Sequence, residues 1–391
     1  GINFLKLHAG YEITGNDDLP SAATRTYFEA ISYAGLAKGL ALSNIGNDKL
    51  KWEHTGTFTV GIDMLLLNNR LSVRADYFDS TTKDLLVRKQ LREEYGLQNY
   101  WTNDGSMRNR GFEVCVGGRI GETKDWQLNA NVTMGHYKNE VERLTDGNFI
   151  TNVMGANMLT AEGNPLGVFY GYKSEGVFTD MEDASKANLS VVDNTGRNLR
   201  FGAGDMHFAD IKVDGIIDEH DMTIIGDPNP DIYGAFGFNV NWKRLSLDAI
   251  FTYSLGNDAF NAMRQQMENG SSLNNQSEAM LRRWTGDGQA TDIPRATYGD
   301  PMGNSRFSDR WIEDASYLKL KQVSLSYSLP VKPRFIQGVQ VWASVTNVFT
   351  MTKYLGTDPE FFYGSQALCQ GIDTGLMPQT RTYNLGIKLN L

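Results

Sequence analysis

The sequence predicts an all-β protein, and within that class a transmembrane antiparallel β-barrel. Three observations predict this fold. Apolar and polar residues alternate with a period of two along many segments. The connections between these segments are alternately long and short, as they are in outer-membrane barrels. No window approaches the roughly 20 continuous apolar residues that a membrane helix needs, so the periodicity decides the class.

The composition fits a turn-rich β protein. Of the 391 residues, 41% are apolar and 21% are charged, which excludes a disordered chain, and 40 glycines favour turns. The formal net charge of −9 argues against a nucleic-acid partner, which requires a basic surface. We interpret the two cysteines, Cys115 and Cys369, as structural, because two are too few for a disulfide framework. The chain enters a strand pattern directly at Gly1, so we expect a fragment or a processed piece.

The strand pattern is clearest at residues 125–134, where Trp126, Leu128 and Val132 share one face and polar residues occupy the other. A second clear strand follows Asn68-Asn69, a dipeptide suited to the positive φ of a tight hairpin turn. The last residues repeat the alternation up to Leu391. In total the pattern predicts about twelve strands. They lie near residues 3–13, 51–67, 70–88, 107–120, 125–143, 150–160, 166–178, 231–242, 244–256, 316–329, 339–351 and 381–391.

The connections sort into two groups by length. The long ones are 14–50, 89–106, 179–230, 257–315 and 352–380, and the short ones are 68–69, 121–124, 161–165, 243 and 330–338. Only the connection at 144–149 breaks the alternation. Because outer-membrane barrels have short periplasmic turns and long extracellular loops, we expect the first strand to run outward and the C-terminus to be periplasmic. The alternative is a soluble β-sandwich, either an enzyme or an adhesin, since one alternating strand also suits a sheet with one wet face.

An acidic segment at 210–221 has the spacing of a calcium-binding loop. Asp210, Asp214, Ile216, Asp218 and Asp221 stand at positions 1, 5, 7, 9 and 12 of that spacing, and position 6 is a glycine. These residues predict a site for Ca²⁺ or Mg²⁺ that would rigidify a loop. Lys212 at position 3 and Asp in place of Glu at position 12 depart from the pattern. The alternative is an acidic, hydrogen-bonded surface turn.

The sequence offers little for catalysis. It contains no HExxH, GxSxG, Walker or GxGxxG motif, so we expect no enzyme. Asp358 and Glu360 resemble an acid–base pair, but we interpret them as solvated surface. Three tryptophans fall in or near long connections, where a ring can stack on a sugar or a peptide side chain. We therefore name Trp101, Trp284 and Trp311 as candidate substrate-binding residues, with packing or a membrane-interface belt as the alternative.

A series of sequence motifs follows the chain in order: 5–16 (LKLHAGYEITGN), 50–53 (LKWE), 69–78 (NRLSVRADYF), 83–86 (KDLL), 103–113 (NDGSMRNRGFE), 167–172 (GVFYGY), 204–205 (GD), 214–218 (DGIID), 225–231 (IGDPNPD), 283–285 (RWT), 308–310 (SDR), 317–320 (YLKL), 346–349 (TNVF) and 356–360 (GTDPE). In these motifs the chain resembles, nearly from end to end, a known family, the SusC/RagA-like TonB-dependent transporters of Bacteroidetes outer membranes. The departures are Lys212, the final Leu391 where the family usually ends in Phe, and residues 20–48, which do not align.

The resemblance implies a barrel of about 22 strands around an N-terminal plug. Residues 1–391 would then be the C-terminal part of one barrel domain, strands eleven to twenty-two, without the plug. It implies TonB-dependent import of oligosaccharides or oligopeptides across the outer membrane. The implied partners are a SusD-like surface lipoprotein, TonB through the N-terminal part, and membrane lipid. The alternatives are a TonB-dependent siderophore or cobalamin receptor and a passive porin.

Overall fold

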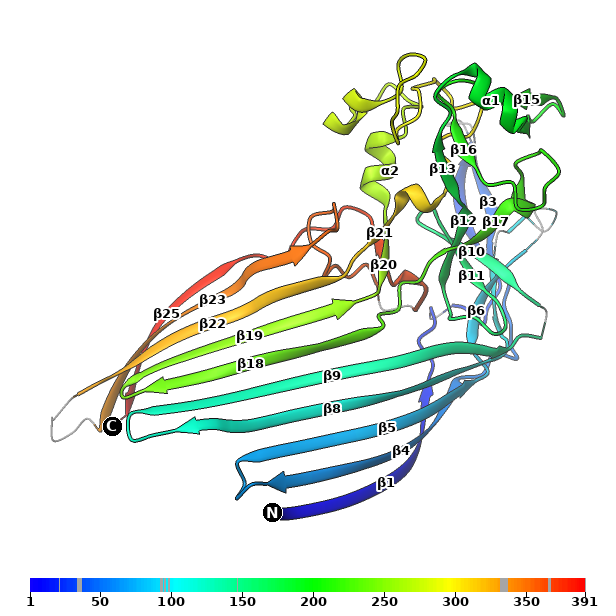
Figure 1. Cartoon of the computed structure of the whole chain (residues 1–391). Coiled ribbons are helices and arrows are strands. Elements are labelled where there is room, and N and C mark those ends of the chain that lie inside the picture. Colours follow the sequence, from blue (N-terminus) through cyan, green and yellow to red (C-terminus); the bar gives the residue numbers. More distant parts are fainter. Residues whose placement is uncertain are drawn as a thin grey trace.

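The backbone is organised around one long antiparallel sheet. The computed structural model describes all residues except 21, 34–36, 92–93, 95, 98, 146, 331–336, 365–366 and 391. In this part of the chain the main sheet has ten strands, and its curved wall can be followed in Figure 1. In spatial order the strands are β1 (Ile2–Asn16), β4 (Glu53–Leu66), β5 (Leu71–Lys83), β8 (Ser106–Glu122), β9 (Trp126–Arg143), β18 (Ile232–Trp242), β19 (Leu245–Leu255), β22 (Tyr317–Leu329), β23 (Gly338–Thr352) and β25 (Thr382–Asn390).

These ten strands correspond to ten of the twelve predicted ones. The predicted strands at 150–160 and 166–178 were wrong as barrel strands. Residues 150–160 form part of a hairpin, β10 (Phe149–Val153) and β11 (Ala156–Thr160), which turns at Met154 and Gly155 with φ values of 51° and 92°. The second segment is split into β12 (Val168–Tyr172) and β13 (Ser174–Val177). Each piece is shorter than the roughly 9–11 residues that cross a bilayer.

With ten strands, the alternation of connection lengths has no exception. The long connections of the sheet are 17–52, 84–105, 144–231, 256–316 and 353–381, and the short ones are 67–70, 123–125, 243–244 and 330–337. The segment 144–149, which broke the predicted alternation, is the start of a single long connection from β9 to β18. Figure 1 shows the long connections gathered at the end of the sheet opposite both termini. The predicted hairpin at Asn68-Asn69 is also confirmed, with φ values of 58° and 61°.

The two faces of the sheet differ in chemistry, as the alternation predicted. Leu7, Tyr11, Leu385 and Ile387 stand on the apolar face and are each more than two-thirds exposed. Neighbouring positions carry polar side chains that bond across strands, such as Thr57 to Ser80 at 2.8 Å. A strand with one exposed apolar face and one polar face suits a barrel wall between lipid and an aqueous interior.

No helix in the described part of the chain is long and apolar enough to cross a membrane.

The hydrophobic core lies in the long connections rather than in the sheet. Three clusters pack there among the described residues: one around Phe178 and Phe208, one around Phe260 and Trp311, and a small one around Tyr354. The remaining elements of the connections are β2 (Tyr27–Tyr33), β3 (Ala37–Asn44), β6 (Leu86–Gln90), β7 (Asn99–Asn103), α1 (Met181–Ala187), β14 (Ser190–Val192), β15 (Asn198–Arg200), β16 (Met206–Phe208), β17 (Met222–Gly226), β20 (Asp258–Asn261), α2 (Ala262–Glu268), β21 (Ile312–Asp314) and β24 (Ile372–Asp373). Short 3₁₀ turns are at Glu219–Asp221, Glu278–Arg282, Asp309–Trp311 and Ala367–Cys369. The connections therefore form a packed layer above the barrel wall.

Candidate ligand-binding site

A cavity of about 400 Å³ lies where the long connections meet the barrel wall. The loop-side ends of β1, β4, β5 and β8 provide its floor, and the connections provide its remaining walls. The apolar lining residues include Leu85, Leu86, Trp101, Phe149, Leu166 and Leu368, and the polar ones include Asp18, Glu53, Thr55 and Thr82. We call this space the loop cavity. An apolar wall with a few placed polar groups is the usual composition of a site for an organic ligand.

Glu53 fastens the connection 84–105 to the wall of the loop cavity. One carboxylate oxygen accepts a 2.8 Å hydrogen bond from the backbone N–H of Leu86, and the other accepts a 2.9 Å bond from the Asn16 amide. Thr55 and Thr82 bond to each other at 2.8 Å on the adjacent strands. Asp18 and Glu53 make the lining acidic, so the cavity favours neutral or cationic groups over anions.

Of the three predicted tryptophans, Trp101 is the one that lines the loop cavity. It lies on β7, which pairs with β6, and its backbone carbonyl accepts a 3.2 Å hydrogen bond from the Asn47 amide. The ring is half-buried, so it keeps a free surface for contact. Contact between Trp101 and a ligand stays a prediction.

Trp311 lies in the core of the loop layer, and contact between Trp311 and a ligand stays a prediction. Its side chain is 0% exposed, and its indole N–H donates a 3.0 Å hydrogen bond to the Arg306 carbonyl. The guanidinium of Arg310 lies 4.3 Å from the ring centroid. The ring is buried because it fills the cluster formed with Phe260 and Ile372. Packing, the alternative reading, is the observed role.

Trp284 supports the packed layer from its edge. Its indole N–H donates a 3.0 Å hydrogen bond to the Thr179 carbonyl, and its ring packs against the cluster around Phe178. A Cβ atom at Gly204 would collide with this ring, and Gly204 also has a positive φ of 80°. Glycine in the Gly204-Asp205 motif therefore lets the backbone lie close to the Trp284 ring. Contact between Trp284 and a ligand stays a prediction.

The acidic loop 210–221 is closed by its own backbone. Asp221 is 0% exposed and uses both carboxylate oxygens: one accepts from the N–H groups of Ile211 and Lys212, and the other from that of Asp218. The Asp210 carboxylate accepts from the N–H groups of Asp214 and Gly215. A network of this kind gives a stable turn without further ligands.

The residues of this loop do not fit a complete metal cage as they stand. Asp221 would have to release at least one of the two N–H groups on its first oxygen to bind an ion with both oxygens. The Lys212 ammonium lies 3.1 Å from Asp214, and it supplies positive charge beside the acidic groups. The described residues contain no group of three or more His, Cys, Asp and Glu side chains placed to hold a metal ion together. Binding of Ca²⁺ or Mg²⁺ at Asp210, Asp214, Ile216, Asp218 and Asp221 stays a prediction.

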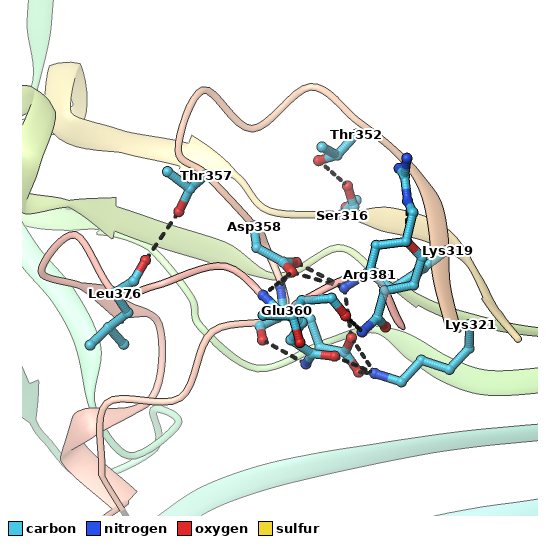
Figure 2. Close-up of polar contacts among 12 residues, drawn as sticks. Ser316, Lys319, Lys321, Thr352, Thr357, Asp358, Glu360, Leu376 and Arg381 are labelled. Atoms are coloured by element: carbon cyan, nitrogen blue, oxygen red, sulfur yellow. Dashed lines mark hydrogen bonds and ion pairs between the residues drawn. The ribbon is translucent and has the colours of Figure 1, made fainter. Parts of the chain in front are cut away.

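A buried ion cluster fastens the last long connection to the barrel wall (Figure 2). The Lys319 ammonium on β22 donates to both oxygens of Asp358 at 2.9 and 3.0 Å and to Glu360 at 2.8 Å. Lys319 is 1% exposed and Asp358 is 9% exposed. The interpretation of Asp358 and Glu360 as solvated surface was therefore wrong. Removing one partner of such a buried pair typically costs about 3–5 kcal/mol.

The charge of Asp358 is stabilised by its neighbours. Burial alone would raise the pKa of this carboxyl, but the Lys319 ammonium and the N–H groups of Glu360 and Gln379 bond to its charged form. The pKa of Asp358 therefore lies below its usual range. The ion pair is formed throughout the neutral pH range.

A β-bulge aims a second lysine at the same cluster. The pairing of β22 with β19 shifts register between Leu320 and Gln322, so Lys321 is left over in that ladder. Its ammonium donates to Glu360 at 2.8 and 3.0 Å and to the Gln379 side-chain carbonyl at 2.7 Å. We call Lys319, Lys321, Asp358, Glu360 and Gln379 the Lys319 anchor.

Sequence reasoning did not single out Lys319. A usable signal was present, because 317–320 and 356–360 were both recognised as motifs, and the structure brings these two motifs together. The other signal is the interrupted alternation on β22, where Lys319 precedes the bulge at Lys321 and Ser324 and Ser326 follow it on the polar face. A break in period within a strand indicates a bulge.

The fold and the site together define a β-barrel wall with a packed loop layer and a cavity between the two. A family model described as "TonB dependent receptor-like, beta-barrel" matches residues 6–207. The chain belongs to this family, which places it in the outer membrane and confirms the predicted resemblance and fold class.

Three relatives illustrate the similarity. TonB-dependent receptor P3 of Formosa agariphila is 30% identical over 99% of this chain and 39% of its own length. TonB-dependent receptor SusC of Bacteroides thetaiotaomicron is 27% identical over 99% of this chain and 38% of its own. A solved structure of the RagAB peptide transporter matches 99% of this chain and 41% of its own, with 28% identity and a TM-score of 0.78. The chain thus spans about two-fifths of the length of these relatives.

Proposed function

We propose that the protein containing this chain imports oligopeptides across the outer membrane by a TonB-dependent mechanism. The observation that carries the proposal is the likeness to the RagAB peptide transporter, which extends over 99% of the chain with a TM-score of 0.78. In this proposal, residues 1–391 are the C-terminal part of one barrel domain. The chain supplies a barrel wall, the loop layer and the loop cavity, and the chemistry is binding and gating rather than bond cleavage.

The lining of the loop cavity supports a peptide ligand. Its aliphatic surface, from Leu85, Leu86, Leu166 and Leu368, suits apolar side chains, and Asp18 and Glu53 suit basic groups or an amino terminus. An oligosaccharide is the second candidate, because Trp101 lines the same cavity and an aromatic ring can stack on a sugar face.

We infer the orientation from the sorted connections. In the proposed arrangement the long connections are extracellular and the C-terminus is periplasmic, since outer-membrane barrels place their short turns in the periplasm. A SusD-like lipoprotein would then cover the loop layer. TonB would act through the N-terminal part of the full protein, as the family resemblance implies.

Two other functions remain as alternatives, a TonB-dependent siderophore or cobalamin receptor and a passive porin. Native mass spectrometry of the full-length protein, extracted in detergent from its outer membrane, separates them. The proposal predicts an equimolar lipoprotein and bound peptides in the complex. A barrel without lipoprotein that carries an iron chelate would contradict it.

Uptake measurements test the energy source and the ligand together. We expect cells with the intact protein to import peptides from a tryptic digest of casein, and cells without functional TonB to lose this import. Import that persists without TonB would favour the porin. Import of oligosaccharides but not of peptides would favour the second ligand class.

A further inference from the structure

The connection 353–381 reaches from the barrel wall to the loop cavity, and contacts hold it at several points along the way. Leu368 lines the cavity together with Met107 on β8 and Trp101 on β7 in the connection 84–105. Ile372 and Asp373 form β24, which pairs with β20 in the loop core. The limbs on either side of this centre carry Asp358, Glu360 and Gln379, the three acceptors of the Lys319 anchor.

The anchor joins both limbs of the connection to one strand. Lys319 bonds to Asp358 and Glu360 on the incoming limb, and Lys321 bonds to Glu360 and to Gln379 on the outgoing limb. The limbs also bond to each other, since the Gln379 N–H donates to Asp358 at 3.3 Å. Figure 2 shows the two lysines converging on the carboxylates from β22. A network of charge-assisted hydrogen bonds at the base of a loop restricts the positions that the loop can adopt.

Burial makes Lys319 an unusual wall residue. Of the twelve largest side chains that are essentially fully buried in the described residues, only Lys319 and Val141 lie on the main sheet. Lys319 is also the only charged member of that group. A buried ammonium persists only when its partners stay in place, so its burial and the position of 358–360 depend on each other.

We propose that Lys319, with Asp358 and Glu360, is a positioning residue for ligand binding: the anchor sets the position of Leu368 and thereby one wall of the loop cavity. The ligand part of this inference rests on the proposed function. The positional part does not, because it concerns the connection itself. Cys369, the neighbour of Leu368, is buried and is a free thiol, so its reactivity reports the position of this wall without any ligand.

The test measures two quantities on the full-length protein in its purified complex. The first is the rate at which maleimide modifies Cys369, followed by peptide mass spectrometry so that other cysteines do not interfere. The second is the affinity for peptides from a tryptic digest of casein. The variants are Lys319→Met and the milder Glu360→Gln. Lys138→Met is the matched control, because Lys138 pairs with Glu140 at 3.0 Å on the wall without reaching the connection.

We expect Lys319→Met to speed modification of Cys369 by at least about tenfold, which corresponds to about 1.4 kcal/mol of easier local opening. Glu360→Gln should have a smaller effect in the same direction, and Lys138→Met should have none. Peptide affinity should fall in the same order. The variants must retain the heat-modifiable gel migration of a folded barrel. If Lys319→Met fails this check, Glu360→Gln decides.

Two results would overturn the inference. Unchanged modification of Cys369 in folded Lys319→Met or Glu360→Gln would show that the anchor does not position the wall. Faster modification with unchanged peptide affinity would show that the wall does not matter for the ligand. If even the unaltered protein binds no peptide, the proposed function fails, and the modification rates still decide the positional part.

Discussion

The Tyr354 hydroxyl donates a 2.7 Å hydrogen bond to Asp373, and both side chains are buried. This bond joins the start of the connection 353–381 to its centre, where β24 pairs with β20. Burial raises the pKa of Tyr354, and the neighbouring Asp373 carboxylate raises it further. The neutral phenol is therefore the form that the folded connection requires.

Tyr354→Phe removes this bond while it keeps the ring. One oxygen of Asp373 then loses its phenol donor, so we expect local destabilisation of about 1–3 kcal/mol. Hydrogen–deuterium exchange should accelerate in 354–376, whereas the strands of the main sheet should be unaffected. Unchanged exchange across that range would contradict the assignment of Tyr354 as a tie within the connection.

The same tyrosine should set the alkaline pH above which the connection 353–381 loses stability. Because its folded pKa is raised, its contribution to stability is present below the unfolded pKa of about 10 and is lost as pH rises above that value. Exchange in 354–376, corrected for the intrinsic effect of pH, should therefore increase above about pH 10. In Tyr354→Phe this pH dependence should be absent, which makes the variant its own control.

The Asp358–Lys319 pair should set the acidic pH below which the connection 353–381 loses stability. The folded pKa of Asp358 is lowered, so its contribution is present above its unfolded pKa of about 3.9 and is lost as pH falls through the folded value. A dipyridyl disulfide reagent, which reacts with thiols in acid, should modify Cys369 at a constant slow rate down to about pH 4 and faster below it. If modification of Cys369 accelerated already near neutral pH, a titratable group other than Asp358 would control the local opening of the connection.

The contact between Gly204 and Trp284 can be tested with a matched glycine. Gly204 and Gly196 both have φ values of 80°, but only Gly204 lies against a ring, whereas nothing lies within 4 Å of a Cβ at Gly196. Gly196→Ala should cost only the backbone strain, about 1–2 kcal/mol. Gly204→Ala should cost about 1–3 kcal/mol more in free energy of unfolding, because its methyl group would overpack the Trp284 ring. Hydrogen exchange in 177–217 measures both, and equal effects would exclude a packing role for Trp284.

Ca²⁺ binding to the acidic loop 210–221 can be tested by removing the positive charge of Lys212. If the loop binds Ca²⁺, Lys212→Asn should tighten binding by at least about tenfold, because it removes a positive charge beside Asp214 and adds an oxygen at position 3. Terbium luminescence of the full-length protein can follow this binding. Lys186→Asn is the control, since Lys186 pairs with Glu182 outside the loop. Equal affinities for the two variants would contradict a metal role for the loop.

Most of the wall could be predicted from the sequence because each membrane strand carries its own alternating pattern. The hairpin β10–β11 shows why the count was too high: its short strands alternate in the same way, and only their pairing reveals that they belong to the connection. The irregular connection at 144–149 already indicated the error, because a strict alternation of lengths requires 144–231 to be one connection.

The site was harder to predict because its contacts join residues that are distant in the sequence. Lys319 and Asp358 are 39 positions apart, and nothing local in either segment specifies that the two side chains meet. The burial of Trp311 could not be predicted for a related reason: a tryptophan in a connection is expected near solvent, but here the connections enclose a core of their own. Burial is set by the tertiary fold rather than by the identity of the segment.

The packed core inside the connections also has a mechanical consequence. Close-packed interiors transmit a displacement instead of absorbing it, so a pull on one rim strand should move the attached clusters as blocks. Residues of one cluster would then be displaced together with their packed neighbours rather than one at a time.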